Sequence, residues 1–411
     1  MSLAAGKWLA SELAYCSNVH PGETAQQVQS NIKNHISQVR EQLGWPVISS
    51  GLWLSAKAAD ELTRNLDQLA EFKRTLADQQ LQLTSLNGFP FGDFHQAVVK
   101  QSVYQPTWAT DKRLDYTYKL AGILAECLPE NEQVGAISTL PLAYKAQWND
   151  ELNYLAMQNL LRLVCMLQKL EQQTGKCIQV GLEMEPDCVF EKTSELVGFF
   201  TEQLLPQAKL QNISAETVLR YLGCCYDTCH QAVLFEDIQT SLSQITQAGI
   251  PLVKVQISNA ISADLSVAGM AEKLTTIFAD KKFLHQCKIK QADGDVLVID
   301  DLSLVALKQA QNNHLNKNDK LECRIHYHVP IHLQKIALSE GIEIATTQQA
   351  IIATLNFLQT NPQLKPKLEV ETYTWLNFVE DNKLSSGDLI TGLTQELEFL
   401  QQQMQRLGLL K

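Results

Sequence analysis

Short apolar segments alternate with amphipathic helical segments along almost the whole chain, and this alternation strongly limits the possible folds. Eight segments have the length and apolar content of buried strands, and a segment with helical spacing of apolar residues follows each. We expect strands at 13–17, 47–54, 81–86, 134–139, 178–184, 222–226, 252–257 and 368–373. We expect helices at 24–43, 56–79, 112–127, 150–174, 191–205, 231–248, 347–359 and 387–407.

Eight strands that are each followed by a helix give the repeat of a closed (β/α)8 barrel, the TIM barrel. The alternative is a doubly wound open sheet, which usually carries a Gly-rich phosphate-binding turn after its first strand. The sequence has no such turn after residues 13–17. It therefore predicts an α/β fold of the barrel type.

One long region interrupts the alternation between the seventh and eighth predicted strands. Within it, residues 283–290, 296–300 and 322–332 have the character of short additional strands. We interpret residues 260–338 as an elaborated loop over the C-terminal face of the barrel. On this interpretation residues 1–411 form a single domain.

The composition limits the kinds of partner that the chain can have. A formal net charge of -11 without a run of Lys and Arg argues against nucleic acid and anionic membranes. No apolar stretch approaches the roughly 20 residues that cross a bilayer, and the start lacks a signal-peptide pattern. The ten cysteines form no zinc-ribbon pairs and lie in apolar contexts, as reduced thiols do. We expect a soluble cytoplasmic protein that binds a small-molecule metabolite, with no nucleic acid and no membrane insertion.

The sixth predicted strand ends in a pair of residues that can bind a metal. Asp227 and His230 are both good ligands for a divalent ion. Three residues apart across a strand-to-helix turn, they can converge on one ion. The alternative is that Asp227 caps the next helix and His230 packs beside it.

Two other predicted strands end in paired carboxylates. Glu183 and Glu185 follow the fifth strand at alternate positions, and Glu369 and Glu371 do the same on the eighth. Alternate residues of a strand share a face, so each pair can point into the barrel. A buried carboxylate needs a cation or hydrogen bonds. The ordinary alternative for each Glu is a helix cap or a bond to a neighbouring Arg.

Further metal-binding groups lie on the seventh strand and in the inserted region. Gln256 offers a neutral amide oxygen, and His326 and His328 share one face of a short strand, with His332 close by. A mixed set of carboxylate, imidazole and amide ligands suits Mn, Zn, Co or Mg. The predicted ligands of this divalent metal ion are Glu183, Asp227, His230, Gln256, His326, His328 and Glu371.

A Gly- and Pro-punctuated loop rich in aromatic residues follows the third strand. Such loops often line a pocket for an apolar or ring-shaped ligand, although this one could also be a packed surface loop. After the first strand, His20 would lie at the rim of the barrel or mark the entry to a helix. The predicted substrate-binding residues are His20, Asn87, Phe89, His95 and Trp108.

These residues, in this order, resemble the xylose-isomerase-like superfamily of barrels, which includes sugar isomerases, sugar epimerases and endonuclease IV-type repair enzymes. In the epimerase branch, Glu, Asp, His and Glu of the last four strands hold the metal. The resemblance implies a ligand set of Glu183, Asp227, Gln256 and Glu371. Gln256 departs from the usual His. His326-Tyr-His328 stands where the repair branch has Asp-x-His, and that branch has further His residues that only His95 could replace here.

Five motifs resemble the EboE family of metabolite-traffic proteins across essentially the whole chain. They occupy residues 13–24, 87–95, 225–233, 324–330 and 368–375. That family is encoded in bacterial operons thought to handle the export of isoprenoid or pigment-like metabolites. The resemblance implies proteins of the same operon as partners, but it does not imply a particular reaction.

The predicted ligands favour a metal-dependent isomerase or epimerase that acts on a sugar or a small carbonyl-bearing metabolite. Proton abstraction next to a carbonyl needs a base and a Lewis acid. We expect the base to be the spare Glu of a pair, which is Glu185 beside Glu183 or Glu369 beside Glu371. His230 is expected to relay protons.

Two other functions are compatible with the same residues. One is a non-catalytic protein that binds a metabolite and hands it over, because Gln256 in place of His weakens a metal site. The other is a metal-dependent phosphoesterase, by analogy with the repair branch. The incomplete His set and the acidic charge count against a nucleic-acid substrate.

Overall fold

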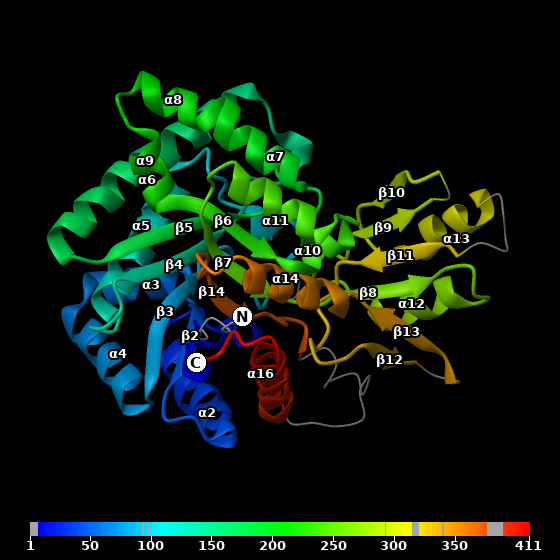
Figure 1. Cartoon of the computed structure of the whole chain (residues 1–411), viewed down its shortest axis with the longest axis horizontal. Coiled ribbons are helices and arrows are strands. Elements are labelled where there is room, and N and C mark those ends of the chain that lie inside the picture. Colours follow the sequence, from blue (N-terminus) through cyan, green and yellow to red (C-terminus); the bar gives the residue numbers. More distant parts are fainter. Residues whose placement is uncertain are drawn as a thin grey trace.

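The central element of the fold is a ring of eight parallel strands. The computed structural model describes residues 7–92, 94–96, 98–291, 293–314, 320–338, 341–375 and 389–411. The strands pair in the order β1-β14-β7-β6-β5-β4-β3-β2. A parallel bridge between Cys16, directly after β1, and Gly51 of β2 joins the two ends. Helices pack around this ring (Figure 1), so the predicted (β/α)8 barrel is confirmed.

The barrel strands lie within a few residues of the predicted segments. Every residue of β2 and β6 is buried, and most of these residues are apolar or small, as expected of strands buried on both faces. Such segments were recognisable in the sequence. The strands are β1 (Ala14–Tyr15), β2 (Ile48–Trp53), β3 (Leu81–Asn87), β4 (Val134–Thr139), β5 (Cys177–Glu183), β6 (Leu222–Asp227), β7 (Leu252–Ile257) and β14 (Lys367–Val370).

Helices connect consecutive barrel strands, with short 3-10 and π turns between some of them. The α-helices are α1 (Ala25–Asn31), α2 (Ser37–Leu43), α3 (Ala56–Arg64), α4 (Leu66–Asp78), α5 (Asp111–Cys127), α6 (Asp150–Thr174), α7 (Thr193–Gly198), α8 (Leu205–Leu210), α9 (Ala215–Tyr221), α10 (Thr228–Val233), α11 (Ile238–Gln247), α14 (Gln348–Thr360) and α16 (Leu389–Arg406). The shorter turns are η1 (Ala10–Glu12), η2 (Ser17–Val19), η3 (Ile32–Ile36), η4 (Lys100–Tyr104), η5 (Lys145–Gln147) and η6 (Phe199–Leu204).

Two predicted helices are interrupted by residues that begin a new helix. The Asn65 side chain accepts hydrogen bonds from the first turn of α4, so the helix predicted at 56–79 is two helices. Asp237 caps α11 in the same way and divides the helix predicted at 231–248. The sequence also did not predict α9. Residues 1–6, Asp93 in the aromatic loop, and the first two residues of the helix predicted at 387–407 lie outside the described residues.

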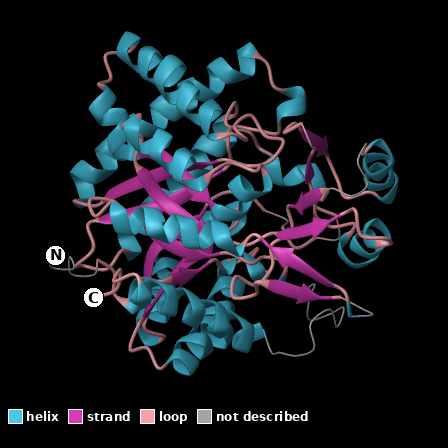
Figure 2. Cartoon of the chain, turned by 45° about the vertical axis from the view of Figure 1, so that its right-hand side comes forward, coloured by secondary structure: helices cyan, strands magenta, loops and turns pink. Residues whose placement is uncertain are grey.

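The region between β7 and β14 contains a sheet of its own. Three of its strands lie within the short additional strands predicted at 283–290, 296–300 and 322–332. Six antiparallel strands pair in the order β10-β9-β11-β8-β13-β12. Figures 1 and 2 show this second sheet beside the barrel. Its elements are β8 (Ile261–Asp264), α12 (Met270–Phe278), β9 (Cys287–Lys290), β10 (Val296–Ile299), α13 (Leu304–Asn313), β11 (Glu322–Ile325), β12 (Lys335–Ala337) and β13 (Glu343–Thr346).

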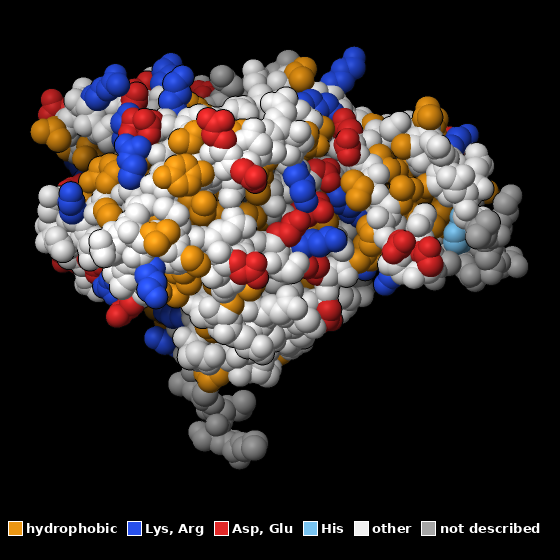
Figure 3. Space-filling view, turned by 90° about the horizontal axis from the view of Figure 1, so that it is seen from above, with side chains coloured by type: hydrophobic (Ala, Val, Ile, Leu, Met, Phe, Trp, Pro, Cys, Tyr) orange, Lys and Arg blue, Asp and Glu red, His pale blue; other side chains and the backbone are white. Residues whose placement is uncertain are grey.

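The surface carries charges of both signs. On the face shown in Figure 3, Lys and Arg side chains are scattered among Asp and Glu. Among the helices that the structure describes, none is both long and apolar enough to cross a membrane.

Candidate metal centre and substrate pocket

Three carboxylates meet at the C-terminal ends of the barrel strands. Glu183 is the last residue of β5, Asp227 is the last of β6, and Glu371 directly follows β14. Each offers an oxygen atom, and these three atoms lie within 4.8 Å of one another. All three side chains are buried. The strand register therefore brings together carboxylates from positions far apart in the sequence, as the strand ends predicted.

Two of these carboxylates each keep one oxygen without a hydrogen-bond partner among the described residues. Asp227 Oδ1 accepts hydrogen bonds from the backbone N–H of His230 at 3.0 Å and from Ser258 Oγ at 2.6 Å. Asp227 Oδ2 and Glu183 Oε2 are buried and unpartnered. Asp227 thus caps α10, as the alternative interpretation held, and still offers a free oxygen to a ligand. An unpaired buried carboxylate oxygen is costly unless a cation meets it.

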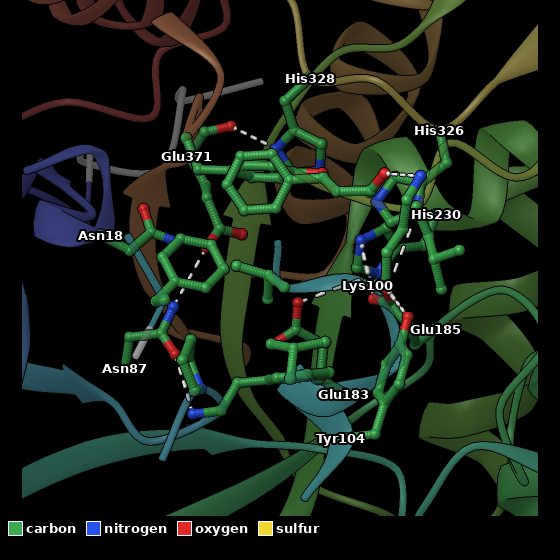
Figure 4. A pocket seen from close by; sticks show the side chains of 18 residues that line it. Asn18, Asn87, Lys100, Tyr104, Glu183, Glu185, His230, His326, His328 and Glu371 are labelled. Carbon is green, nitrogen blue, oxygen red and sulfur yellow. Dashed lines mark hydrogen bonds and ion pairs between the residues drawn. The ribbon is translucent and has the colours of Figure 1, made fainter. Parts of the chain in front are cut away.

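The third carboxylate is held in place by two amides. Asn18 Nδ2 donates to Glu371 Oε1 at 2.7 Å, and Asn87 Nδ2 donates to the same oxygen at 3.1 Å. Figure 4 shows both amides beside Glu371 at one side of the pocket. Asn87 was predicted to bind substrate, whereas Asn18 was not among the predicted site residues. These amides fix the orientation of the carboxylate.

Two imidazoles from the inserted region point a free nitrogen into the same space. His326 Nδ1 lies 2.8 Å from Gln286 Oε1, and His328 Nδ1 lies 2.8 Å from the backbone oxygen of Glu371. Because both neighbours are acceptors, each Nδ1 carries the proton and each Nε2 keeps its lone pair. Both Nε2 atoms are buried and have no hydrogen-bond partner in the part of the chain that the structure describes. Histidines that bind metals are usually held in this way by an acceptor at the other ring nitrogen.

His230 lies between the carboxylates and the other imidazoles. Its Nδ1 is 2.7 Å from the backbone oxygen of Met184, so that nitrogen is also held by an acceptor. Its Nε2 lies 3.1 Å from Glu185 Oε2 and 3.8 Å from Asp227 Oδ2. The hydroxyl of Tyr104 donates to Glu185 Oε1 at 3.1 Å. Glu185 and His230 therefore form a buried acid–base pair beside the carboxylate triad.

The ligand atoms form overlapping groups that could each hold an ion. The carboxylate triad shares no residue with the group formed by Glu185, His230 and His326. Further groups combine His328 either with Asp227 and His230 or with His326 and Cys229. The sequence did not predict Cys229, which resembles any other buried apolar thiol there.

Burial strongly shifts the acidity of these groups. Burial raises the pKa of Glu371 to about 8 and that of Glu185 to about 7. Burial and repulsion from neighbouring carboxylates hold the pKa of Glu183 well above its usual range. Burial lowers the pKa of His328 to about 4 and that of His326 far below its ordinary value. Neutral imidazoles and under-compensated carboxylates are the groups that a divalent cation stabilises, so the described residues fit such an ion.

The predicted amide ligand lies next to the carboxylate triad. Gln256 of β7 is in register with Asp227 of β6 and with Glu369 of β14. Its side chain is buried, and neither its oxygen nor its nitrogen has a partner among the described residues. This position suits a neutral ligand, and the role of Gln256 stays a prediction.

Glu369 has a different environment from the spare base that the sequence predicted. Its two oxygens accept hydrogen bonds from Lys254 Nζ and Ser85 Oγ, both at 2.8 Å. Lys254 and Glu369 are completely buried. A Cβ atom at Gly51 would lie 1.6 Å from Glu369 Oε2, so this ion pair occupies the space that the glycine leaves open. With both oxygens engaged, Glu369 is not available as a base.

A pocket that is partly open to solvent extends from the metal centre. Of the predicted substrate-binding residues, Asn87 and Phe89 line it. His20, His95 and Trp108 do not line it, because each makes contacts elsewhere. Trp108 donates to Thr139, His20 stacks on His35, and His95 lies 2.8 Å from the backbone oxygen of Asn18.

Comparison with known proteins gives similarity to solved structures alone. No protein-family model and no curated protein sequence matches the chain. The D-allulose 3-epimerase from a Methylomonas species, in complex with D-allulose, is 11% identical, with 98% of this chain and 100% of that chain covered and a TM-score of 0.47. A D-tagatose 3-epimerase-like protein is 11% identical over 95% of this chain and 99% of that chain, with a TM-score of 0.45. The IolI protein with a bound zinc atom is 11% identical over 96% and 97%, with a TM-score of 0.44.

Proposed function

We propose that this protein is a metal-dependent isomerase or epimerase of a small carbonyl-bearing metabolite. The observation that supports it is the carboxylate triad, with its unpartnered buried oxygens, directly beside the Glu185–His230 pair. Proton transfer at a carbon next to a carbonyl needs a base and a stabiliser of negative charge in one place. The pocket offers residues for both.

In this proposal the carboxylates and the amide hold the ion. Glu183, Asp227 and Glu371 would be its charged ligands, and Gln256 a neutral one. When bound, a divalent ion supplies a Lewis acid that stabilises negative charge on a substrate oxygen. Asn18 and Asn87 keep Glu371 oriented toward that position.

Glu185 is the proposed base. With its pKa raised by burial to about 7, it is partly ionised at neutral pH and can both take and return a proton. Burial lowers the pKa of His230, but the nearby carboxylates of Asp227 and Glu185 outweigh this effect and the net pKa is raised. His230 Nε2, 3.1 Å from Glu185, can therefore hold the proton between steps.

Two measurements on one preparation test this function. Mass spectrometry of bound metal should find one ion per chain in the wild type and none in Asp227→Asn. Nuclear magnetic resonance in D2O, with a panel of ketoses and other α-hydroxyketones, should find deuterium entering next to the carbonyl. Glu185→Gln should keep the metal and lose the exchange. Metal binding without exchange on any compound would reject catalysis and leave a metabolite-handover protein, the function that the unusual Gln256 ligand also allows.

A second candidate function is metal-dependent hydrolysis of phosphoesters. The observation that favours it is the second ligand group, Glu185, His230 and His326, which shares no residue with the carboxylate triad. Two ions held side by side can stabilise both the attacking and the leaving oxygen of a phosphoester. In that case Glu185 is a ligand and is not a free base. Two bound ions per chain and hydrolysis of bis(4-nitrophenyl) phosphate would replace the first proposal by this one.

The resemblance to the EboE family supports a proposal about the cellular role. On that basis the protein acts in a metabolite-traffic pathway with proteins of the same operon. Affinity purification from the native host, with the operon intact, should recover those proteins together with the chain. Recovery of the chain alone would count against this role and would leave the chemistry of the site untouched.

A further inference from the structure

The pocket beside the candidate metal centre has one polar end and one apolar wall. Glu183, Glu185, Glu371 and the three histidines form the polar end. The apolar wall consists of Phe89, Phe94, Val99, Val103, Phe283 and Tyr373. Figure 4 shows the charged and imidazole side chains converging, with ring side chains beside them. The pocket therefore offers two chemically different surfaces to one ligand.

The apolar wall is a packed cluster built from three distant segments. The ring centroids of Phe94 and Phe283 lie 5.2 Å apart, and those of Phe283 and Tyr373 lie 5.1 Å apart. Tyr373 also lies 4.7 Å from the ring of His328, so the wall is continuous with the polar end. Aromatic rings at these separations stabilise one another and present a fixed apolar surface.

Backbone and ion-pair contacts fix this wall. The backbone N–H groups of Val99 and Lys100 donate to the backbone oxygen of Lys282 at 2.8 and 2.9 Å. Lys100 Nζ donates to the backbone oxygen of Phe283 at 2.7 Å and to Asp301 Oδ2 at 2.6 Å. The Lys100 ammonium group is thus engaged in joining the aromatic loop to the inserted region. It is not placed to bind an anionic substrate.

Most other polar groups of the pocket are already engaged. Asn18 and Asn87 each use their amide nitrogen on Glu371, and the Asn87 oxygen accepts from the backbone N–H of Phe89. The Tyr104 hydroxyl donates to Glu185. Among the side chains of the described lining residues outside the predicted metal ligands, Asn18 Oδ1 is buried without a hydrogen-bond partner and can meet a substrate hydroxyl. A sugar chain has a hydroxyl on nearly every carbon, and each one buried without a partner would cost affinity.

We propose that the ligand of this site has an oxygen-bearing head and an apolar, ring-bearing body, and that it is not a polyhydroxylated chain. The head binds at the metal centre, and the body lies against the wall formed by Phe94, Phe283 and Tyr373. The assignment of the head rests on the proposed function, because the metal would hold it. Selectivity for the apolar body of the ligand can be measured by binding alone, without turnover.

Two chelators with the same head and different bodies test this proposal. Benzohydroxamate carries a phenyl ring, and D-erythronohydroxamate carries a chain of hydroxyl groups. Isothermal titration of the full chain loaded with Zn²⁺ should show benzohydroxamate binding at least tenfold more tightly, since the ring leaves water for an apolar wall. Equal affinities, tighter binding of the polyhydroxylated probe, or no binding of either probe would overturn the proposal.

Matched variants locate the effect. Phe283→Leu should weaken benzohydroxamate binding about fivefold and leave D-erythronohydroxamate unchanged. Phe72→Leu, at a buried position of α4 that does not line the pocket, should change neither affinity. If Phe283→Leu lowers the affinity for both probes equally, or for neither probe, the apolar wall does not select the body of the ligand. Metal content is measured on every sample, so failure of the metal centre is recognised separately from loss of selectivity.

Discussion

The barrel buries carboxylates at two depths, and the contacts of their oxygens differ. Deeper in the barrel, Glu369 has both oxygens engaged by Lys254 and Ser85. Two residues further along the chain, Glu371 joins Glu183 and Asp227, two of whose oxygens have no partner among the described residues. The chain can thus supply a lysine to a buried carboxylate, and it does so at only one of the two levels. We call Lys254 and Glu369 the inner pair, and Glu183, Asp227 and Glu371 the outer group. The difference indicates that the inner pair stabilises the fold and that the outer group is available to a ligand.

The largest effect should come from breaking the inner pair. Lys254→Met leaves Glu369 buried without its cation, and loss of one partner of a buried pair typically costs about 3–5 kcal/mol. Urea unfolding monitored by circular dichroism measures this loss. The double variant with Glu369→Gln removes both charges and should recover most of the stability. If the double variant is as unstable as the single one, packing and not charge explains the loss.

The outer group should respond in the opposite way. In metal-free protein, Asp227→Asn removes an under-compensated charge and should leave stability unchanged or raised. In the wild type, metal at about 100 times its dissociation constant should stabilise the fold by about 2.7 kcal/mol. Asp227→Asn should lose this gain. Thermal unfolding with and without metal measures both values, and an equal gain in the variant would contradict the proposed ligand.

Gly51 lies beside the inner pair, and its missing side chain leaves the space that the Glu369 carboxylate occupies. Gly51→Ala would place a methyl group on the Glu369 carboxylate, and such overpacking costs about 2 kcal/mol. In the Lys254→Met/Glu369→Ala background the space is open, and the same substitution should cost much less. Unfolding of all four proteins completes this cycle. Equal costs in the two backgrounds would show that Gly51 is needed for a reason other than the pair.

The same comparison shows why the sequence predicted some parts and not others. The barrel strands are segments rich in apolar and small residues and were recognisable, whereas β8, β12 and β13 are strands of three or four residues that a sequence cannot separate from loops. The alternation of residues along the strand predicted that Glu369 and Glu371 share one face. It did not predict that they lie at different depths in the barrel. The lysine that neutralises Glu369 comes from β7, more than a hundred residues earlier, and no local pattern connects the two.

The aromatic pocket was predicted from the loop after the third strand, but its members were only partly correct. Phe89 lines the pocket, whereas Trp108 packs in the core. Phe283 and Tyr373 come from segments whose position over the barrel depends on tertiary contacts. Similarly, Asn18 reaches Glu371 only because β1 pairs with β14. Strand-end residues were predictable because parallel strands share an edge, and contacts between loops were not.

The last predicted effect concerns a buried carboxylate of a third kind, which has hydrogen bonds but no cation beside it among the described residues. Glu396 of α16 accepts from Thr372 Oγ1 at 2.7 Å and from the backbone N–H of Ile331 at 2.9 Å. Burial raises its pKa to about 7. The folded state therefore holds this proton more tightly than the unfolded chain does, and the stabilisation is complete at low pH and is lost as pH rises toward 7.

Glu396→Gln tests this sign directly. The variant should lose a part of the pH dependence of unfolding between pH 4.5 and 7, about 2–3 kcal/mol, because glutamine keeps the acceptor oxygen and does not titrate. Urea unfolding at a series of pH values measures the difference between the two proteins. Glu398→Gln, on the exposed side of the same helix, is the control and should leave the slope unchanged. A wild-type stability that rises with pH relative to Glu396→Gln would show that the hydrogen bonds outweigh burial, and that Glu396 resembles Glu369 more than the open carboxylates.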